Sequence, residues 1–384
     1  MRKHFFIFAI MVMICSVTIG QTTYSQELVN KAEAGNAEAQ LNLGVCYSNG
    51  DGVGQDYAKA VYWFTKAAEH GYAIAQLNLG VCYGNGYGVS QDHAKAVYWY
   101  TKAAEQGNAY AQNNLGVCYY NGYGVSQDHA KAAYWYTKAA EQGNAKAQNN
   151  LGLCYKKGDG VSRDYGKAVY WYNTAAKQGH AGAQRNLGYC YYNGNGVDQD
   201  PVKGIYWLSK AAEQGDADAQ TFLGVCYYIG SDVSQDSLKA VYWWERAAEQ
   251  GYAIAQFSLG NYYIGNYYDC NSINKDKAIY YYEKAASSMD TAQLFLAGIY
   301  YSSPEISDNY AKSVKYLTMA RESDDKTISG RACNWLSKCY RNGRGVPKDI
   351  NKANELQAEA ESKGCGGDIN ELIKKLKEEY SIIK

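Results

Sequence analysis

Three short motifs in the C-terminal part of the chain carry residue types that could perform acyl transfer. Ser272 and Lys275 are three residues apart, a Ser-Asp-Asn run begins at Ser307, and a Lys-Thr pair begins at Lys326. In that chemistry the serine is the nucleophile, and it must lie at a buried helix start with its lysine one turn on, facing a sheet edge. The surrounding sequence predicts no sheet, and Ser272 falls in a loop before a helix. We therefore interpret the motifs as coincidental and expect no catalytic residue.

Six cysteines recur at intervals of 36 residues: Cys46, Cys82, Cys118, Cys154, Cys190 and Cys226. Each 36-residue unit holds only one of them, and helix packing would separate neighbours by about 10 Å. A disulfide requires Cα atoms within about 7 Å, so we expect free, buried thiols. A bridge among Cys270, Cys333 and Cys365, which lie outside this register, stays open. No cysteine spacing is that of a zinc site, so we expect neither a metal nor a cofactor.

Two histidines and a set of glycine-rich loops are the other residues with potential chemistry. His93 and His129 occupy equivalent positions at the start of a predicted helix, and 36 residues between them are too many for one metal ion. We expect both to be exposed first-turn residues. Loops such as 84–88 recur between helices and follow no predicted strand, so we interpret them as turns and not as phosphate-binding loops.

The feature that positions all of these residues is a repeat of 36 residues. The last glycine of the pattern A-x-A-Q-x-x-L-G recurs at that interval, at Gly44, Gly80, Gly116, Gly152, Gly188, Gly224 and Gly260. A fixed period of this length is typical of a solenoid, in which each unit buries its apolar face only against its neighbours. The sequence therefore predicts an all-α stack of helix pairs with an extended surface for binding.

Each unit is predicted to contain two helices, here called the A helix and the B helix. In the first unit the A helix begins at Ala37 and ends near Tyr47, glycines force a turn, and Asp56 caps the B helix. Gly71 follows the B helix, where a left-handed residue is expected. Six units keep this pattern and three looser ones follow. Their ranges are 36–71, 72–107, 108–143, 144–179, 180–215, 216–251, 252–288, 289–328 and 329–363.

The segments outside the repeats have predicted roles of their own. Residues 1–20 combine a basic start with a mainly apolar stretch of 15 residues from Phe5 to Ile19, which is typical of a secretory signal peptide and too short to span a bilayer comfortably. The mature chain is expected to start near Gln21, and lipid attachment at Cys15 is disfavoured because a large residue precedes it. Residues 21–35 lead into the repeats. Residues 364–384 are predicted to form a capping helix with a polar outer face.

The charge of the mature chain argues against nucleic acid as a partner. Its formal net charge is −2, because the first 20 residues contain two of the 38 basic residues and none of the 38 acidic ones. A protein that binds nucleic acid normally carries a basic surface instead. No segment after residue 20 is apolar enough to cross a membrane.

The repeated pattern closely resembles the Sel-one-like repeat family, a relative of the tetratricopeptide repeats. In the first unit the matching residues are Ala37, Ala39, Gln40, Leu43, Gly44, Tyr47, Gly50, Gly52, Val53, Asp56, Lys59, Ala60, Trp63, Ala67, Ala68 and Gly71. The resemblance covers about residues 30–363 and implies a right-handed α/α superhelix of about nine repeats. It also implies an adaptor or scaffold for protein complexes, often in bacterial envelopes or in contact with a host. A secreted, cysteine-rich subgroup with a disulfide in each helix pair is linked to weak β-lactam binding or hydrolysis, and this chain departs from it.

Comparison between the units singles out four variable positions on the A helix, numbered 38, 41, 45 and 48 in the first unit. Their spacing places them along one stripe of the helix. The stripe presents Tyr110, Asn113, Tyr120, Lys146, Asn149, Lys156, Arg185, Tyr189, Tyr192, Asp218, Thr221 and Tyr228. The A helix lines the concave side of related superhelices, so the resemblance implies a binding groove here. Aromatic, amide and cationic side chains suit a peptide or a carbohydrate.

Each B helix carries a run of three aromatic residues, which is Tyr62-Trp63-Phe64 in the first unit. Three consecutive residues cover about 200° of a helix, so they cannot all face one seam. We expect the tryptophan to pack between helices and one tyrosine of each run to be partly exposed.

Together these features predict an exported, non-enzymatic scaffold that binds a protein or peptide, most simply a protein of the cell envelope or of a host. Two alternatives from other classes stay open. One is a carbohydrate-binding protein that uses the tyrosines of the stripe. The other is a hydrolase that acts on β-lactam or peptidoglycan-like substrates and depends on a residue such as Ser272.

Overall fold

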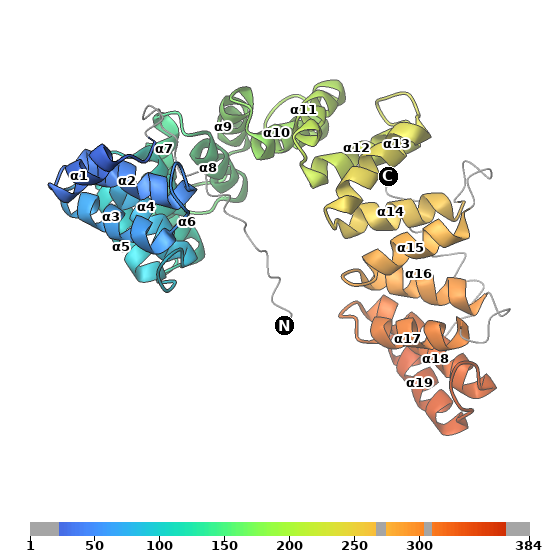
Figure 1. Ribbon diagram of the computed structural model, residues 1–384. Helices are drawn as coiled ribbons and strands as arrows, with labels where there is room; N and C mark the ends of the chain where they lie inside the picture. Colours follow the sequence, from blue (N-terminus) through green and yellow to red (C-terminus); the bar gives the residue numbers. More distant parts are fainter. Residues whose placement is uncertain (1–22, 266–273, 303–308, 366–384) are drawn as a thin grey trace. The chain divides into compact units, whose positions relative to one another are not determined.

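The computed structural model describes residues 23–265, 274–302 and 309–365 (Figure 1). Within these ranges the chain forms 19 α-helices and no β-strand, and helix pairs pack consecutively, which confirms the predicted fold class. The predicted signal peptide, the predicted capping helix beyond Cys365, and Cys270, Ser272 and Ser307 lie outside the described residues.

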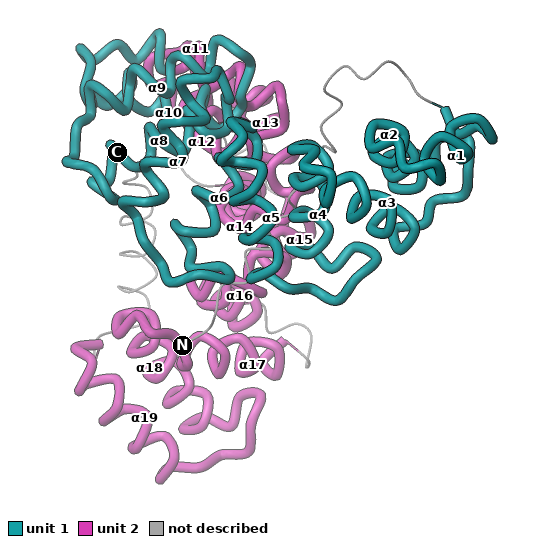
Figure 2. Tube along the Cα trace, turned by 90° about the vertical axis from the view of Figure 1, so that its left-hand side faces the viewer, with its two compact units in different colours: residues 1–204 teal, residues 205–384 magenta. Residues whose placement is uncertain are grey.

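The chain divides into two compact units, residues 1–204 and 205–384 (Figure 2). In the first unit, α1 precedes four complete A–B pairs and a fifth A helix. The helices are α1 (Gln26–Glu33), α2 (Ala37–Asn49), α3 (Tyr57–Glu69), α4 (Ala73–Asn85), α5 (His93–Glu105), α6 (Ala109–Asn121), α7 (His129–Glu141), α8 (Ala145–Lys157), α9 (Tyr165–Lys177) and α10 (Ala181–Asn193). The even-numbered helices from α2 onward are A helices, and the odd-numbered helices from α3 onward are B helices.

The helix α11 (Pro201–Glu213) begins at the end of the first unit and continues into the second. The remaining helices of the second unit keep the alternation of A and B helices, with less regular lengths. They are α12 (Ala217–Ile229), α13 (Ser237–Glu249), α14 (Ala253–Tyr263), α15 (Lys275–Ala285), α16 (Asp290–Tyr301), α17 (Asn309–Arg321), α18 (Lys326–Asn342) and α19 (Ile350–Ser362).

Capping residues set the helix bounds locally. Asp56 has an extended backbone, and its side chain accepts a hydrogen bond from the backbone N–H of Lys59 at 3.0 Å. The predicted aspartate caps recur at Asp92, Asp128, Asp164, Asp200 and Asp236. At the end of α2, Gly50 adopts a left-handed conformation with φ 84°, and Gly71 after α3 does so with φ 86°. These caps satisfy backbone groups that a helix end leaves unpaired, and in the first repeat they set the end of α2 and the start of α3.

A glycine in α2, α4, α6, α8, α12 and α14 allows an aromatic ring of the paired B helix to lie against the helix backbone. A Cβ built on Gly80 would lie 2.6 Å from the Tyr100 ring, well inside contact distance. Gly44 has the same relation to Phe64, and Gly224 would meet Trp244 at 2.3 Å. The glycine that recurs every 36 residues therefore provides the space for the largest core side chain of its pair.

A second glycine, in the turn between the A and B helices, makes the contact between consecutive repeats. Gly88 has φ +69°, and a Cβ there would lie 2.3 Å from the carbonyl of Tyr57 in the preceding repeat. Gly124 approaches His93 at the same distance. Only glycine fits, because the backbone is left-handed and touches the first turn of the preceding B helix.

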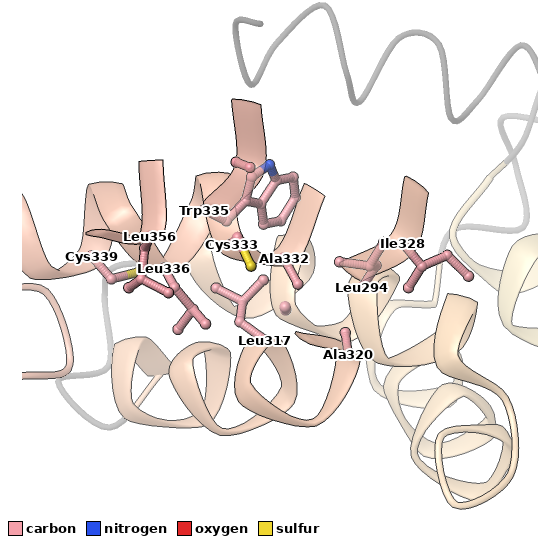
Figure 3. Packing of buried hydrophobic residues seen from close by; sticks show 12 residues of the cluster. Leu294, Leu317, Ala320, Ile328, Ala332, Cys333, Trp335, Leu336, Cys339 and Leu356 are labelled. Atoms are coloured by element: carbon pink, nitrogen blue, oxygen red, sulfur yellow. The ribbon is translucent and has the colours of Figure 1, made fainter. Parts of the chain in front are cut away.

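The end of the second unit has a continuous core, shown in Figure 3. Leu294 of α16, Leu317 of α17, Trp335 of α18 and Leu356 of α19 are buried together in one cluster. Four consecutive helices thus contribute to one core, although the 36-residue pattern is weak here.

An ion pair also joins α17 to α19. Arg321 Nη2 lies 2.7 Å from a carboxylate oxygen of Glu359, and Lys363 Nζ lies 2.6 Å from the other oxygen. Hydrogen bonds from these two cations lower the pKa of Glu359 to about 2. The carboxylate is therefore ionised at neutral pH, which keeps α19 attached to α17 of the preceding repeat.

The glycine contacts lead to a paired prediction on one helix. Gly80→Ala should lower the stability by about 1 to 3 kcal/mol, because the new methyl group overpacks the Tyr100 ring. Gly84→Ala, one turn later on α4, should raise it by about 0.5 to 1 kcal/mol, since its Cβ would meet Ala96 and Tyr100 only at an ordinary 3.6 Å. Urea unfolding of both variants measures the difference. Equal effects of the two substitutions would contradict the role given to Gly80.

Candidate protein-interaction surface

The predicted variable positions, which we call the A stripe, lie on α6, α8 and α10 of the first unit and on α12 of the second. The A stripe consists of Tyr110, Asn113, Tyr120, Lys146, Asn149, Lys156, Arg185, Tyr189, Tyr192, Asp218, Thr221 and Tyr228. The A stripe is most exposed near the N-terminal end of α6 and α8. Tyr110 of α6 is 47% exposed, and Lys146 of α8 is also exposed. These two residues occupy the same position in consecutive A helices.

The middle of the A stripe lies in the seam between consecutive A helices. Asn113 is buried, and its side-chain oxygen accepts a hydrogen bond from Asn150 of the next repeat at 3.1 Å. Asn149 accepts one from Asn186 at 2.9 Å in the same way. In the first two repeats the equivalent residues are buried leucines, Leu41 and Leu77. The A stripe is therefore not uniformly open, because its second position holds one repeat against the next.

Tyr120, at the C-terminal end of the A stripe on α6, belongs to a cluster of polar groups. Its hydroxyl donates to Asp159 at 2.6 Å and lies 3.2 Å from Lys157 Nζ, and its ring stacks on His129 with centroids 4.8 Å apart. Burial and the Asp159 carboxylate raise the pKa of Tyr120. The third repeat is thus tied to the turn of the fourth, and the Tyr120 ring is half-buried.

Of the other predicted residues, Thr221 of α12 is buried and the rest are partly exposed. In the first unit, Arg185, Tyr189 and Tyr192 of α10 are half-buried. In the second unit, the Tyr228 ring of α12 lies 5.3 Å from the Trp244 ring and 6.3 Å from the Tyr262 ring. The structure therefore places the A stripe at repeat junctions, with its polar and aromatic ends reaching the surface.

A buried glutamine in α4, α6, α8 and α12 links three consecutive helices, and reasoning from the sequence missed this role. Gln76 of α4 donates to the carbonyl of Ala68 at the end of α3, and its oxygen accepts from Gln106 at the end of α5 at 2.7 Å. Gln112 and Gln148 repeat the arrangement. The signal was available, since a polar residue at a fixed position beside buried alanines requires a partner.

The comparisons with known proteins agree with this geometry. The sequence model of the Sel1 repeat matches nine consecutive segments of the chain: 37–72, 73–108, 109–144, 145–180, 181–216, 217–252, 253–288, 291–325 and 330–364. The chain belongs to the Sel1 repeat family. Its fold is that of a protein-interaction scaffold. No curated protein matches the chain in sequence.

Two solved structures share both the fold and a substantial part of the sequence. One is a protective antigen present in uropathogenic Escherichia coli strains that displays an SLR fold. It is 37% identical with a TM-score of 0.67, and the match covers 87% of this chain and 70% of that one. The other is a Sel1 repeat protein from Oxalobacter formigenes. It is 33% identical with a TM-score of 0.54, and the match covers 58% of this chain and 95% of that one.

The repeat cysteines Cys82, Cys118, Cys154 and Cys190 of this Sel1 repeat protein are free and buried, as predicted. Burial raises the pKa of Cys82, Cys118 and Cys154 to about 12, so these thiols stay protonated at neutral pH and are poor nucleophiles. Cys333 is also free and buried, and Cys365 is free and half-buried. In the part of the chain that the structure describes, no three His, Cys, Asp or Glu side chains are grouped as a metal site would require. Nor is any described helix both long and apolar enough to span a membrane.

The prediction that the two first-turn histidines are exposed is wrong. His93 and His129 are half-buried, because the His93 ring stacks on Tyr123 at 5.4 Å and the His129 ring stacks on Tyr120. The first residue of a B helix faces the glycine turn of the following repeat, and a planar side chain fills that junction.

The prediction for the aromatic runs of the B helices is confirmed. Trp99 of α5 is half-buried and packs against the core that α3 and α4 form, while Tyr98 is exposed. Trp135 packs in the same way against the core of α5 and α6. Each tryptophan therefore joins its own repeat to the preceding one.

The glutamine network makes a prediction for the first repeat. The oxygen of the buried Gln40 has no hydrogen-bond partner, because His70 stands where Gln106 and Gln142 stand in later repeats. His70→Gln should supply the missing donor and stabilise the protein by about 1 kcal/mol, which a urea midpoint measures. The matched control Gln106→His should destabilise it by a similar amount. A His70→Gln variant no more stable than the parent would contradict the role of the network.

Proposed function

We propose that this Sel1 repeat protein is an exported, non-enzymatic scaffold that binds a protein or peptide partner through the A stripe. The observation that supports this most directly is the contrast between fixed and variable positions. The glycines, glutamines and caps that hold the helix pairs recur in register. The A stripe instead changes from tyrosine to lysine to arginine along the chain, as expected of a surface adapted to one particular partner.

The chemistry of the exposed ends of the A stripe favours a protein. Tyr110 and Lys146 are exposed on neighbouring A helices, and Arg185 and Tyr192 of α10 are partly exposed. Tyrosine and arginine are the residue types that most often dominate binding energy at protein interfaces. The asparagine contacts at Asn113 and Asn149 fix the spacing between these anchors, so a partner would meet a preformed surface.

Export is the second part of the proposal. The basic start and the apolar stretch of residues 1–20 have the composition of a secretory signal peptide. The similar structure from uropathogenic Escherichia coli is described as a protective antigen, and an antigen has to meet the immune system of the host. We therefore propose that the partner is a protein of the cell envelope or of a host.

The binding proposal predicts that substitutions in the A stripe weaken binding of the partner, whereas substitutions on the B helices do not. The mature chain 21–384 serves as bait for envelope and host proteins, beside a variant that carries Tyr110→Ala, Lys146→Ala and Arg185→Ala. A partner held through the A stripe should bind the variant at least tenfold more weakly, which corresponds to about 1.4 kcal/mol or more. The Kd of the captured partner for each bait is then measured by biolayer interferometry.

The matched control for this experiment carries Tyr98→Ala and Tyr134→Ala, two residues of similar exposure on the B helices. This control should bind as the parent does. Equal loss in both variants, or no loss in the A-stripe variant, would remove the A stripe from the binding surface. Circular dichroism checks that all baits keep their helix content.

The export proposal predicts the N-terminus of the mature protein. The protein recovered from outside the cytoplasm should begin at or near Gln21, which intact mass spectrometry measures. Replacing Phe8 and Ile10 by arginine should leave the precursor uncleaved in the cytoplasm, because the apolar stretch is interrupted. An uncleaved parent chain, or one that begins with a lipid-modified Cys15, would contradict the prediction.

A further inference from the structure

The B helices carry a second regular surface that the scaffold proposal does not use. Tyr62, Tyr98, Tyr134 and Tyr170 occupy the same position of α3, α5, α7 and α9, and each is between 54% and 61% exposed. We call these four tyrosines of the first unit, with Lys66, Lys102 and Lys138, the B ladder. In the second unit, Tyr242 and Tyr280 repeat the position with similar exposure.

Packing within the fold does not require these tyrosines to point outward. The seam between repeats is filled by the next residue, since Trp99 packs on the core of α3 and α4, and Trp135 on that of α5 and α6. The Tyr98 ring meets Trp99 edge to face with centroids 4.9 Å apart. The tryptophan thus contacts one side of the tyrosine ring, and about half of each tyrosine remains exposed to solvent.

A cation accompanies three of the four rings. The Nζ atoms of Lys66, Lys102 and Lys138 lie 5.8, 5.0 and 5.8 Å from the ring centroids of the tyrosines four residues before them. In the second unit, Arg246 and Lys284 stand in the same relation to Tyr242 and Tyr280. The first three steps of the ladder therefore each present one aromatic ring and one positive charge together.

The composition of this surface differs from that of a protein interface. A protein interface has a continuous apolar centre, whereas each B-ladder ring is surrounded by exposed polar residues such as Lys59, Lys66 and Glu69. The steps are also alike, because the first three repeats show the same Tyr and Lys while the A stripe changes over the same repeats. A surface that repeats one chemistry at a fixed spacing is complementary to a ligand that repeats too.

We infer that the B ladder of the first unit binds an acidic polysaccharide lying across consecutive B helices. The apolar face of a sugar ring would stack on a tyrosine, and its carboxylate or sulfate would pair with the neighbouring lysine. Because several weak steps act on one polymer, affinity should rise steeply with chain length.

The test is affinity electrophoresis of the mature chain in gels that contain one polymer each. The probes are polygalacturonate, alginate, hyaluronate and heparin, with neutral dextran and poly-glutamate as controls. At least one acidic polysaccharide should retard the protein, and neither control should do so. Binding to none of the four, or equal retardation by poly-glutamate, would overturn the inference.

Two triple variants separate stacking from simple charge attraction. Tyr62→Ala, Tyr98→Ala and Tyr134→Ala together should weaken binding at least tenfold with the lysines intact, and the corresponding Tyr→Phe variant should retain it. Lys66→Gln, Lys102→Gln and Lys138→Gln together should weaken it as well. Full binding by the Tyr→Ala variant would overturn the inference, as would fragments of one disaccharide that bind as tightly as the polymer.

A last variant keeps this inference distinct from the scaffold proposal. The protein with Tyr110→Ala, Lys146→Ala and Arg185→Ala should bind the polysaccharide like the parent, because none of these residues belongs to the B ladder. Loss of polysaccharide binding in this variant would overturn the assignment to the B helices. Loss of protein binding alone would leave it intact.

Discussion

The close approach of an A-helix glycine to a B-helix aromatic ring is the contact on which the rest of the structure depends. At Gly80 the Tyr100 ring occupies the volume that any side chain would need. With the two backbones this close, only small residues fit along the remainder of the interface, which explains the buried alanines Ala75, Ala96 and Ala103. A chain with little leucine and isoleucine can therefore still form a dense core, because aromatic rings of the B helices pack against the backbone of the A helices.

Polar contacts fix how far one repeat is shifted along the next, which the apolar packing alone leaves variable. Apolar surfaces slide past one another with little change in energy, whereas a buried amide must meet its partner or lose hydrogen bonds. Gln76 bonds to the helix before it and to the helix after it, and Asn113 bonds to Asn150 across the next seam. These side chains thus fix how far each repeat is shifted along its neighbour. That shift decides where the exposed residues of consecutive A helices lie.

The helices and their ends could be predicted from the sequence, but not all of the contacts between repeats. The caps at Asp56 and Gly50 were predictable because they act within a few residues. The recurrence of a glycine every 36 residues predicted the helix pairs. The burial of Asn113 and of His93 was not predictable in the same way. One helix viewed alone shows which residues share a face, but not which part of that face the next repeat covers. Two consecutive asparagines, Asn113-Asn114 and again Asn149-Asn150, were the feature of the sequence that indicated a polar contact between repeats.

The two helix layers are under different constraints, and this difference is the reason to assign them different ligands. In the A layer, the residues that build the fold are glycine, alanine and glutamine, so Tyr110 or Lys146 can change without disturbing a core contact. Variation there is consistent with selection for one partner. In the B layer the tyrosines keep their place in successive repeats, each with its ring edge to face with the neighbouring tryptophan and about half of its surface open to solvent. The exposed face of the ring and the lysine beside it lie outside that contact, and their recurrence in the first three repeats supports a ligand that meets those repeats in the same way.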